Sequence, residues 1–318
     1  MQPNNEPTIL IYHDKEAEDY ANRIRQHGYS AVKTASTPAE AIERFPFAEV
    51  LFCWNFPDSL IPRLANTPIR WIQSMGAGVD TFANHPDFPK HILLTRVVGQ
   101  FGPLMAEYIF AYLLYLAIQI EKLSQNQKAK RWEPFFPHYL SKKTIGIAGL
   151  GSIGGEVVRK ARAFDMKIYG LSNRGKNAHL VDRHFYPDEW KNFVRDLDYL
   201  ILTLPLTPQT HHVINREILQ AMKATAILCN VGRGKLIVEQ DLIQTLNSGH
   251  LQAAILDVFE QEPLPKDSPL WTMKNVYITP HLSGPGFPES IVEYFLENLQ
   301  LYQNGQPLKG IVNLDRGY

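Results

Sequence analysis

The sequence predicts an α/β protein built from two doubly wound parallel-sheet domains with a cleft between them. Apolar runs of strand length alternate along the chain with stretches of helical periodicity, which is the pattern of parallel βαβ units. A length of 318 residues suits about two domains. In the second half, residues suited to chemistry follow the ends of four apolar runs, and the carboxyl ends of parallel strands meet at one edge of a sheet.

The first domain is expected to be a small doubly wound unit. A helix is expected at 15–27, where Gly28 ends the apolar periodicity. The expected strands of this half are 8–13, 31–35, 50–54, 70–74 and 92–95.

The second domain is expected to begin after a long apolar helix. The four strands with chemistry at their ends are expected at 143–149, 225–231, 251–259 and 275–280, with a further strand at 167–171 and a helix at 156–164. A last helix, 288–303, is expected to return to the first domain. The predicted domains are therefore 1–100 plus 287–318, and 101–286.

Charge and cysteine content exclude several classes of protein. Lys plus Arg and Asp plus Glu both total 32, so bulk charge favours neither nucleic acid nor an anionic membrane. Cys53 and Cys229 lie in apolar runs and are interpreted as buried thiols rather than a disulfide. The amino terminus lacks the basic and apolar regions of a signal peptide, so we expect a cytoplasmic protein.

One apolar stretch, 104–120, invites interpretation as a membrane span. It is shorter than the ~20 residues that a span needs, and Glu107 would be costly in lipid. We therefore expect a buried helix at a contact between domains or subunits, with no membrane insertion.

A Gly-rich turn at 149–154 predicts a dinucleotide site. It joins the apolar run at 144–148 to a helix and has the spacing G-x-G-x-x-G. The glycines would allow a tight turn, close approach of a pyrophosphate to the backbone, and close packing of the helix on the strand. Since the expected second-half strands lie in one parallel sheet, we expect a Rossmann cofactor domain beside a flavodoxin-like substrate domain.

The loop after strand 167–171 favours NADP(H) over NAD(H). An NAD site usually places Asp or Glu there, but this chain has Ser172, Asn173, Arg174 and then Lys176. Cations and hydroxyl or amide donors suit a 2′-phosphate. The alternative is an ordinary solvated basic loop.

Arg233 lies between two glycines beyond the strand at 225–231. A guanidinium can bind a carboxylate through two hydrogen bonds while it polarises an adjacent carbonyl. The alternative is an exposed loop arginine, and its place at a strand's carboxyl end favours the functional interpretation.

Glu262 and His281 form the expected proton-transfer pair. Reduction of a ketone by hydride needs a proton for the developing alkoxide, and the pKa of histidine suits that task near neutrality. A neighbouring carboxylate would raise that pKa and orient the ring. The other histidines, including His211 and His212, are interpreted as structural, and no cluster indicates a metal site.

These motifs resemble the family of D-isomer-specific 2-hydroxyacid dehydrogenases over nearly the whole chain, and within it the NADPH-dependent glyoxylate and hydroxypyruvate reductases. The segments that carry the resemblance are 76–80, 149–154, 204–210, 230–234, 256–263 and 280–281, and, for that branch, 75–80, 172–174, 263–271 and 315–318. One departure is Leu282-Ser283-Gly284, where many relatives have an alanine before the glycine.

The resemblance implies roles for particular residues. Arg233, Glu262 and His281 fall on catalytic positions, and the Gly76-Ala77-Gly78 loop, with Arg233, would hold the substrate carboxylate. Asp257 would lie near the nicotinamide carboxamide. The residues expected to contact the cofactor are Gly149, Gly151, Ser152, Ile153, Gly154, Ser172, Asn173, Arg174, Lys176, Leu204, Pro205, Thr210, Val231, Gly232, Asp257, His281 and Gly284.

The expected function is reduction of a small 2-oxo acid to a 2-hydroxy acid by NADPH, with NADH less favoured. Glyoxylate and hydroxypyruvate are the leading substrates through the resemblance alone, and bulkier acids such as phenylpyruvate follow. Trp54, Met75 and Arg96 follow or end first-domain strands and could line the pocket or simply pack. A dinucleotide-sensing protein without turnover is the alternative from another class. The apolar residues at 104–120 and 132–137 predict a homodimer.

Overall fold

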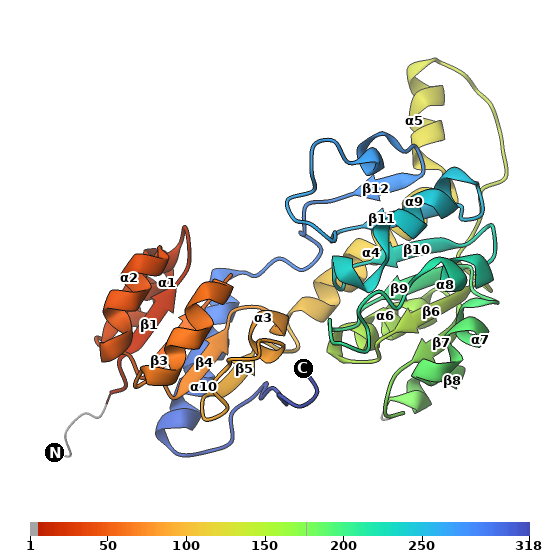
Figure 1. Cartoon of the computed structure of the whole chain (residues 1–318). Coiled ribbons are helices and arrows are strands. Elements are labelled where there is room, and N and C mark those ends of the chain that lie inside the picture. Colours follow the sequence, from red (N-terminus) through yellow and green to blue (C-terminus); the bar gives the residue numbers. More distant parts are fainter. Residues whose placement is uncertain (1–5, 176) are drawn as a thin grey trace. The chain divides into compact units, whose positions relative to one another are not determined.

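The computed structural model describes residues 6–175 and 177–318, so Lys176, one of the expected cofactor residues, lies outside the described residues. The chain divides into two compact units (Figure 1). The first comprises the chain up to Gln100 together with Gly286–Tyr318, and the second is Phe101–Pro285. The domain boundaries predicted from the sequence lie between residues 100 and 101 and between residues 286 and 287.

The first unit contains a five-stranded sheet in which every strand pair is parallel. The order β2-β1-β3-β4-β5 is that of flavodoxin-like sheets. Each strand lies within the range expected from the sequence, apart from the last residue of β5. The strands are β1 (Ile9–Tyr12), β2 (Val32–Ala35), β3 (Val50–Cys53), β4 (Trp71–Ser74) and β5 (Leu93–Arg96).

Helices cover both faces of this sheet (Figure 1). On one face, α1 (Ala17–Gln26) lies beside α10 (Pro288–Gln303), and the ring of Phe295 stacks on Phe52 with 4.3 Å between centroids. The opposite face is covered by α2 (Pro38–Arg44), α3 (Asp80–Ala83) and 3₁₀ turns at Phe45–Phe47 and Asp58–Asn66. Because α10 supplies core residues, this unit is built from both ends of the chain.

A buried polar network ties α10 and the tail to the sheet. Asn298 donates to Gln73 Oε1 at 2.9 Å and accepts the Lys309 N–H at 2.8 Å. Thr95 donates to the same Gln73 oxygen at 2.8 Å, and Trp71 Nε1 donates to Thr95 at 2.7 Å. Since buried polar groups are costly when unpaired, this network selects one docking position for the helix.

The second unit contains a seven-stranded, wholly parallel sheet of order β12-β11-β10-β9-β6-β7-β8. This is the Rossmann arrangement, in which the strand order reverses between β6 and β9. The strands are β6 (Thr144–Ala148), β7 (Lys167–Leu171), β8 (Arg183–Phe185), β9 (Tyr199–Leu202), β10 (Ile227–Asn230), β11 (Ala253–Leu256) and β12 (Val276–Ile278). The helices are α4 (Phe101–Ile118), α5 (Ile120–Lys128), α6 (Ser152–Ala163), α7 (Trp190–Val194), α8 (Arg216–Ala221) and α9 (Glu239–Asn247), with 3₁₀ turns at Ala178–Leu180, Pro187–Glu189, Gly234–Leu236 and Pro269–Thr272.

The apolar stretch near residue 104 is helix α4, which packs on α6. Phe110 stacks on Phe164 with 5.1 Å between ring centroids. Of the described helices, α4 alone has the length and apolar composition of a membrane span, and 44% of its residues are buried. Its buried residues include Met105, Ile109, Phe110 and Leu113, so part of its apolar surface is covered by the fold.

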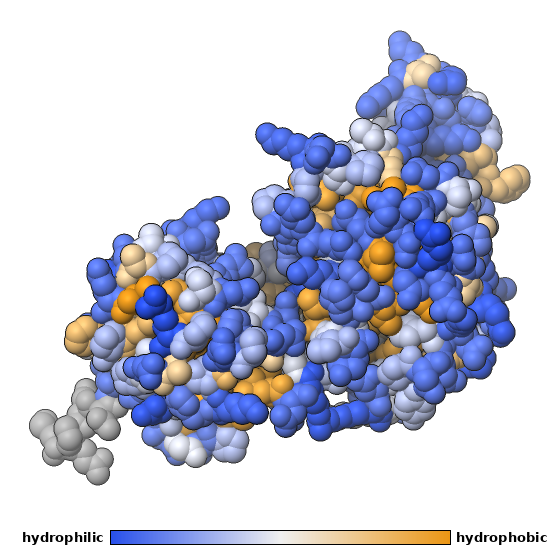
Figure 2. Space-filling model, viewed as in Figure 1, coloured by the Kyte–Doolittle hydropathy of each residue, from blue (hydrophilic) through white to orange (hydrophobic). Residues whose placement is uncertain are grey.

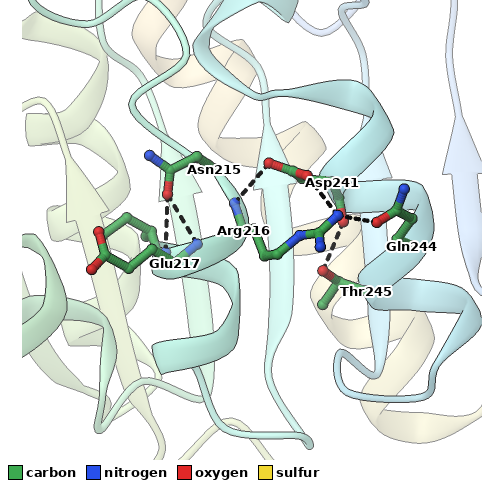
Figure 3. Close-up of polar contacts among 7 residues, drawn as sticks. Asn215, Arg216, Glu217, Asp241, Gln244 and Thr245 are labelled. Atoms are coloured by element: carbon green, nitrogen blue, oxygen red, sulfur yellow. Dashed lines mark hydrogen bonds and ion pairs between the residues drawn. The ribbon is translucent and has the colours of Figure 1, made fainter.

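The first residue of α8 is joined to α9 by polar contacts (Figure 3). The Asn215 side chain caps α8 by accepting the N–H groups of Glu217 and Ile218 at 3.1 and 3.2 Å. The Arg216 N–H donates to Asp241 Oδ2 at 2.9 Å, and its guanidinium also donates to Asp241 and to Gln244. These contacts fix α8 against α9 above the apolar core of the unit.

Apolar side chains lie mainly inside the units. The face drawn in Figure 2 is largely hydrophilic, with apolar side chains in separate patches. Cys53 and Cys229 are both buried and unbonded, which confirms their interpretation as free thiols.

Candidate active site

Three neighbouring strands bring the predicted catalytic residues to one edge of the second sheet. Arg233 follows β10, Glu262 follows β11 and His281 follows β12, and these strands are adjacent and parallel. Their carboxyl ends therefore meet, although the residues are up to 48 positions apart in the chain.

His281 and Glu262 form a hydrogen-bonded pair. His281 Nδ1 lies 2.8 Å from Glu262 Oε2, and because a carboxylate only accepts, Nδ1 carries the hydrogen. This hydrogen bond raises the pKa of His281 above its ordinary value, while burial and the Arg233 charge act in the opposite direction. Burial would raise the pKa of Glu262, but hydrogen bonds from His281 and the Phe259 N–H leave it lowered. In the described part of the chain, Nε2 of His281 makes no hydrogen bond to another protein group.

The turn that carries Arg233 is held by its own strand. The Asn230 side chain accepts the Gly232 N–H at 3.1 Å and donates to the Arg233 carbonyl at 2.9 Å. Gly234 is required here, because a Cβ on it would lie 1.8 Å from the Phe259 carbonyl carbon. The absence of a side chain at residue 234 lets the arginine turn lie directly on the segment that leads to Glu262. The Arg233 charge is close enough to affect the pKa of both His281 and Glu262.

Asp257 is fully buried beneath the His281 turn. Its carboxylate accepts the N–H groups of Leu282 and Ser283 at 2.8 and 2.9 Å, and its carbonyl accepts the His281 N–H at 2.9 Å. The resemblance places this residue near the cofactor, whereas the visible contacts of its side chain are with the turn. Asp257 therefore stabilises the loop that carries His281.

The Gly-rich turn has the geometry that a pyrophosphate site needs. It leaves β6 at Gly149, which has φ +102°, and Gly151 is the N-cap of α6. A Cβ on Gly154 would lie 1.9 Å from the Gly149 carbonyl oxygen, so only glycine allows the helix to start so close to the strand. Ser152 and Ile153 form the first turn of α6, whose N–H groups can bind an anion. The residues present thus fit a dinucleotide.

The remaining cofactor candidates lie on neighbouring loops of the same unit. Ser172 hydrogen-bonds His184 Nε2 at 2.8 Å, and Asn173 and Arg174 are exposed beyond β7. Thr210 donates to the Pro205 carbonyl at 2.7 Å, which closes the loop after β9. The other candidates follow strand ends or pack beside them: Leu204, Val231, Gly232 and Gly284. In residues 6–175 and 177–318 no cluster of His, Cys, Asp or Glu could hold a metal.

The predicted carboxylate loop, Gly76-Ala77-Gly78, belongs to the first unit. It follows β4, and the Trp54 ring lies so close that a Cβ on Gly76 would be 2.7 Å from it. Arg96 donates to the Ala77 carbonyl at 2.9 Å, and Met75 is buried. Within the described part of the chain, the Ala77 and Gly78 N–H groups donate to no protein acceptor. Backbone N–H groups that have no protein acceptor are suited to bind an anion.

Known proteins share sequence and fold with this chain. Residues 110–283 match the family "D-isomer specific 2-hydroxyacid dehydrogenase, NAD binding domain". The chain belongs to the D-isomer specific 2-hydroxyacid dehydrogenases. A glyoxylate/hydroxypyruvate reductase A from Yersinia enterocolitica is 31% identical over 277 residues, which is 85% of this chain and 88% of the relative.

Solved structures of this dehydrogenase family have the same fold. A family member from Aeromonas salmonicida has a TM-score of 0.85 and 33% identity, covering 97% of this chain and all of that one. The NADPH-dependent glyoxylate/hydroxypyruvate reductase of Sinorhizobium meliloti, solved with NADP and sulfate, has a TM-score of 0.87 and 26% identity, covering 98% of this chain and all of that one. The resemblance noted in the sequence is confirmed.

Sequence reasoning missed several polar residues that shape this dehydrogenase site. Thr279 and Tyr108 hydrogen-bond to each other at 2.6 Å, and Thr279 donates to Asp257 at 2.6 Å. Asn177 donates to the Leu150 carbonyl at 2.6 Å, inside the Gly-rich turn. The sequence carried only a weak signal for these residues. Thr279 lies two residues before His281, and Tyr108 lies in a stretch that was noted only for its apolar content.

Proposed function

We propose that this dehydrogenase reduces small 2-oxo acids, with glyoxylate and hydroxypyruvate as leading substrates, to the 2-hydroxy acids with NADPH. The observation that carries the proposal is the His281–Glu262 pair, placed with Arg233 at one sheet edge in a unit that also holds a dinucleotide turn. The reductase names of relatives that are 26–31% identical support the substrate class.

His281 is the proposed proton donor. A bound nicotinamide dinucleotide supplies the hydride, which adds to the keto carbon, and the carbonyl electron pair moves to oxygen. His281 Nε2 delivers a proton to that oxygen, and solvent then restores it. Glu262 accepts the Nδ1–H and raises the pKa of the ring, which favours its protonated form before transfer. Arg233 polarises the carbonyl and binds the carboxylate.

The Gly76–Gly78 loop is the proposed second anchor for the substrate carboxylate. Its Ala77 and Gly78 N–H groups would bind the anion. The first unit is therefore the proposed substrate domain.

NADP(H) is the proposed cofactor because the loop after β7 carries Ser172, Asn173 and Arg174 and has no carboxylate. Related structures from Xanthobacter autotrophicus and Sinorhizobium meliloti were solved with NADPH and NADP. We expect Arg174→Ala to weaken NADPH binding about tenfold or more, since a charge-assisted hydrogen bond to phosphate is lost, and to leave NADH almost unchanged.

Fluorescence titration of the reduced nicotinamides checks this expectation. Arg195→Ala removes an exposed arginine after α7 and serves as the control. Equal weakening of NADPH and NADH by Arg174→Ala would contradict a phosphate role for this loop.

The pH dependence of reduction should depend on Glu262. Reduction uses protonated His281, whose pKa is raised in the fold, so the rate should fall as pH rises through that raised pKa. Glu262→Gln removes the largest cause of the raised His281 pKa. The alkaline limb of the kcat/KM profile should therefore move to lower pH. Glu260→Gln, which alters the neighbouring pair with His212, should leave the limb in place. Superimposable profiles for Glu262→Gln and the unaltered enzyme would remove Glu262 from this role.

The function itself is tested by nicotinamide absorbance with NADPH or NADH and each of glyoxylate, hydroxypyruvate, pyruvate and phenylpyruvate. Oxidation of NADPH that is faster than that of NADH, with glyoxylate or hydroxypyruvate as the substrate, supports the proposal. A preference for phenylpyruvate would overturn the substrate assignment and retain the chemistry. Cofactor binding without turnover on any 2-oxo acid would favour a sensing protein instead.

A homodimer is the proposed assembly. The segment 129–143 after α5 carries three aromatic side chains that are highly exposed: Trp132 at 95%, Phe136 at 97% and Tyr139 at 69%. Apolar surface of this kind is favoured at subunit contacts. We expect twice the chain mass in light scattering at micromolar concentration, and a Trp132→Ser, Phe136→Ser double variant should shift toward monomer. A monomeric unaltered protein would refute this proposal.

A further inference from the structure

A chain of hydrogen bonds through the buried side chains of Thr279 and Asp257 connects helix α4 to the turn that carries His281. Tyr108 Oη lies 2.6 Å from Thr279 Oγ1, and Thr279 Oγ1 lies 2.6 Å from Asp257 Oδ1. The same Asp257 oxygen accepts the Leu282 N–H at 2.8 Å, and the other oxygen accepts the Ser283 N–H at 2.9 Å. Every member of this chain lies in the second unit.

The direction of each hydrogen bond follows from the acceptor at its end. A carboxylate only accepts, so the Thr279 hydroxyl hydrogen points to Asp257. Thr279 has one hydrogen to give, so Tyr108 must donate to Thr279. Because Asp257 is fully buried and Thr279 is 9% exposed, water is poorly placed to replace either donor.

The turn needs such support because its backbone conformation is unfavourable. His281 has φ +52°, in the left-handed region that residues with a Cβ rarely adopt. Such conformations persist where the surroundings over-determine them. Here the supports are the His281, Leu282 and Ser283 N–H groups, and all three donate to oxygens of Asp257.

We propose that Tyr108 and Thr279 are positioning residues, which act through the Asp257 carboxylate to hold the His281 imidazole on Glu262. Thr279 and Tyr108 fix where the buried carboxylate lies, the carboxylate fixes the turn, and the turn aims the ring. The kinetic part of this inference rests on the proposed function, whereas the geometric part does not require turnover.

The charges around His281 allow the ring position to be measured directly. Glu262, Arg233 and Asp257 are the charged groups that act on it, and the Glu262 hydrogen bond is the strongest influence toward a higher pKa. If the turn loosens, the ring moves away from Glu262 and the pKa of His281 falls. A variant that only destabilised the fold would lower the melting temperature without this change.

The experiment follows the imidazole C–H signals of the holoenzyme with NADP by NMR as pH is varied, and the His281→Gln spectrum identifies the signal of interest. The variants are Thr279→Val, which keeps the shape and removes the hydroxyl, Tyr108→Phe, and Thr279→Ser as rescue. Tyr112→Phe is the matched control, since its ring is 5.0 Å from that of Tyr108 on the same helix, and no hydrogen bond of its hydroxyl is present among the described residues. Rates of NADPH oxidation with glyoxylate are measured alongside.

We expect His281 to titrate at lower pH in Thr279→Val and in Tyr108→Phe, and at its original position in Thr279→Ser and Tyr112→Phe. We expect kcat to fall about tenfold in Thr279→Val and about threefold in Tyr108→Phe, from loss of a buried hydrogen bond, with KM nearly constant. An unchanged His281 titration in folded Tyr108→Phe would overturn the inference, even if Thr279→Val failed to fold. If no 2-oxo acid is reduced, the proposed function fails, while the titrations still decide this inference.

Discussion

Replacing His281 with alanine is expected to slow 2-oxo acid reduction by about a thousandfold, in the middle of the range for loss of a general acid. The reason is that His281 Nε2 is the proposed source of the proton, while Nδ1 is occupied by Glu262 at 2.8 Å. NADPH binding should be retained, because the dinucleotide turn is on β6 and α6. Stopped-flow absorbance for turnover and nicotinamide fluorescence for binding measure the two effects separately.

His212→Ala is the matched control for this variant. His212 also pairs with a glutamate, with Nε2 lying 3.0 Å from Glu260, but it follows the β9 loop and has no assigned part in the reaction. It should keep nearly full turnover. Comparable losses of turnover in both variants would show that a His–Glu pair supports folding. Normal turnover in His281→Ala would remove His281 from the mechanism.

Arg233→Ala is expected to reduce kcat/KM by a factor of about 10² to 10⁴. The variant loses a guanidinium that can make two charge-assisted hydrogen bonds to the carboxylate, each worth ~1.5–3 kcal/mol. The guanidinium also donates to the Gly232 carbonyl at 2.8 Å, but the fold should survive, because the Asn230 side chain still holds the turn through Gly232 and the Arg233 carbonyl. Steady-state kinetics with glyoxylate and thermal melting check both statements.

Arg233→Lys separates charge from geometry. Lysine keeps the positive charge but presents it as a point rather than a planar fork, so it should recover only part of the lost kcat/KM. Arg216→Ala removes an arginine of α8 that pairs with Asp241, and it should leave the kinetics unchanged. An Arg233→Ala enzyme within threefold of normal kcat/KM would contradict substrate binding by this residue.

Most strands and their ends were predictable because buried parallel strands are almost wholly apolar, although β9, which is also apolar and buried, was not among the expected strands. The run expected at 143–149 is β6 at Thr144–Ala148, and the helix expected at 288–303 is α10 with the same bounds. Polar residues directly after such strands must lie at the sheet edge, so Arg233, Glu262 and His281 could be grouped without coordinates. Short strands without chemistry at their ends, such as β8, carried no comparable signal.

Contacts that bury a polar side chain could not be predicted in the same way. The sequence shows Asp257 as an acid after a strand, which suits the cofactor as well as the turn. Only the fold shows its carboxylate beneath Leu282 and Ser283. Likewise, nothing local in the chain links Tyr108 to Thr279, which are 171 residues apart.

The sequence by itself determined the α/β class, the dinucleotide turn and the identity of the catalytic candidates, because these follow from local periodicity and from residues adjacent to strand ends. Tertiary structure alone decided which hydrogen bond each polar group makes, and hence the His281–Glu262 geometry and its support by Asp257. The physical reason is that hydrogen bonds depend on distances of about 3 Å between segments remote in sequence, and these distances are set by packing rather than by local pattern.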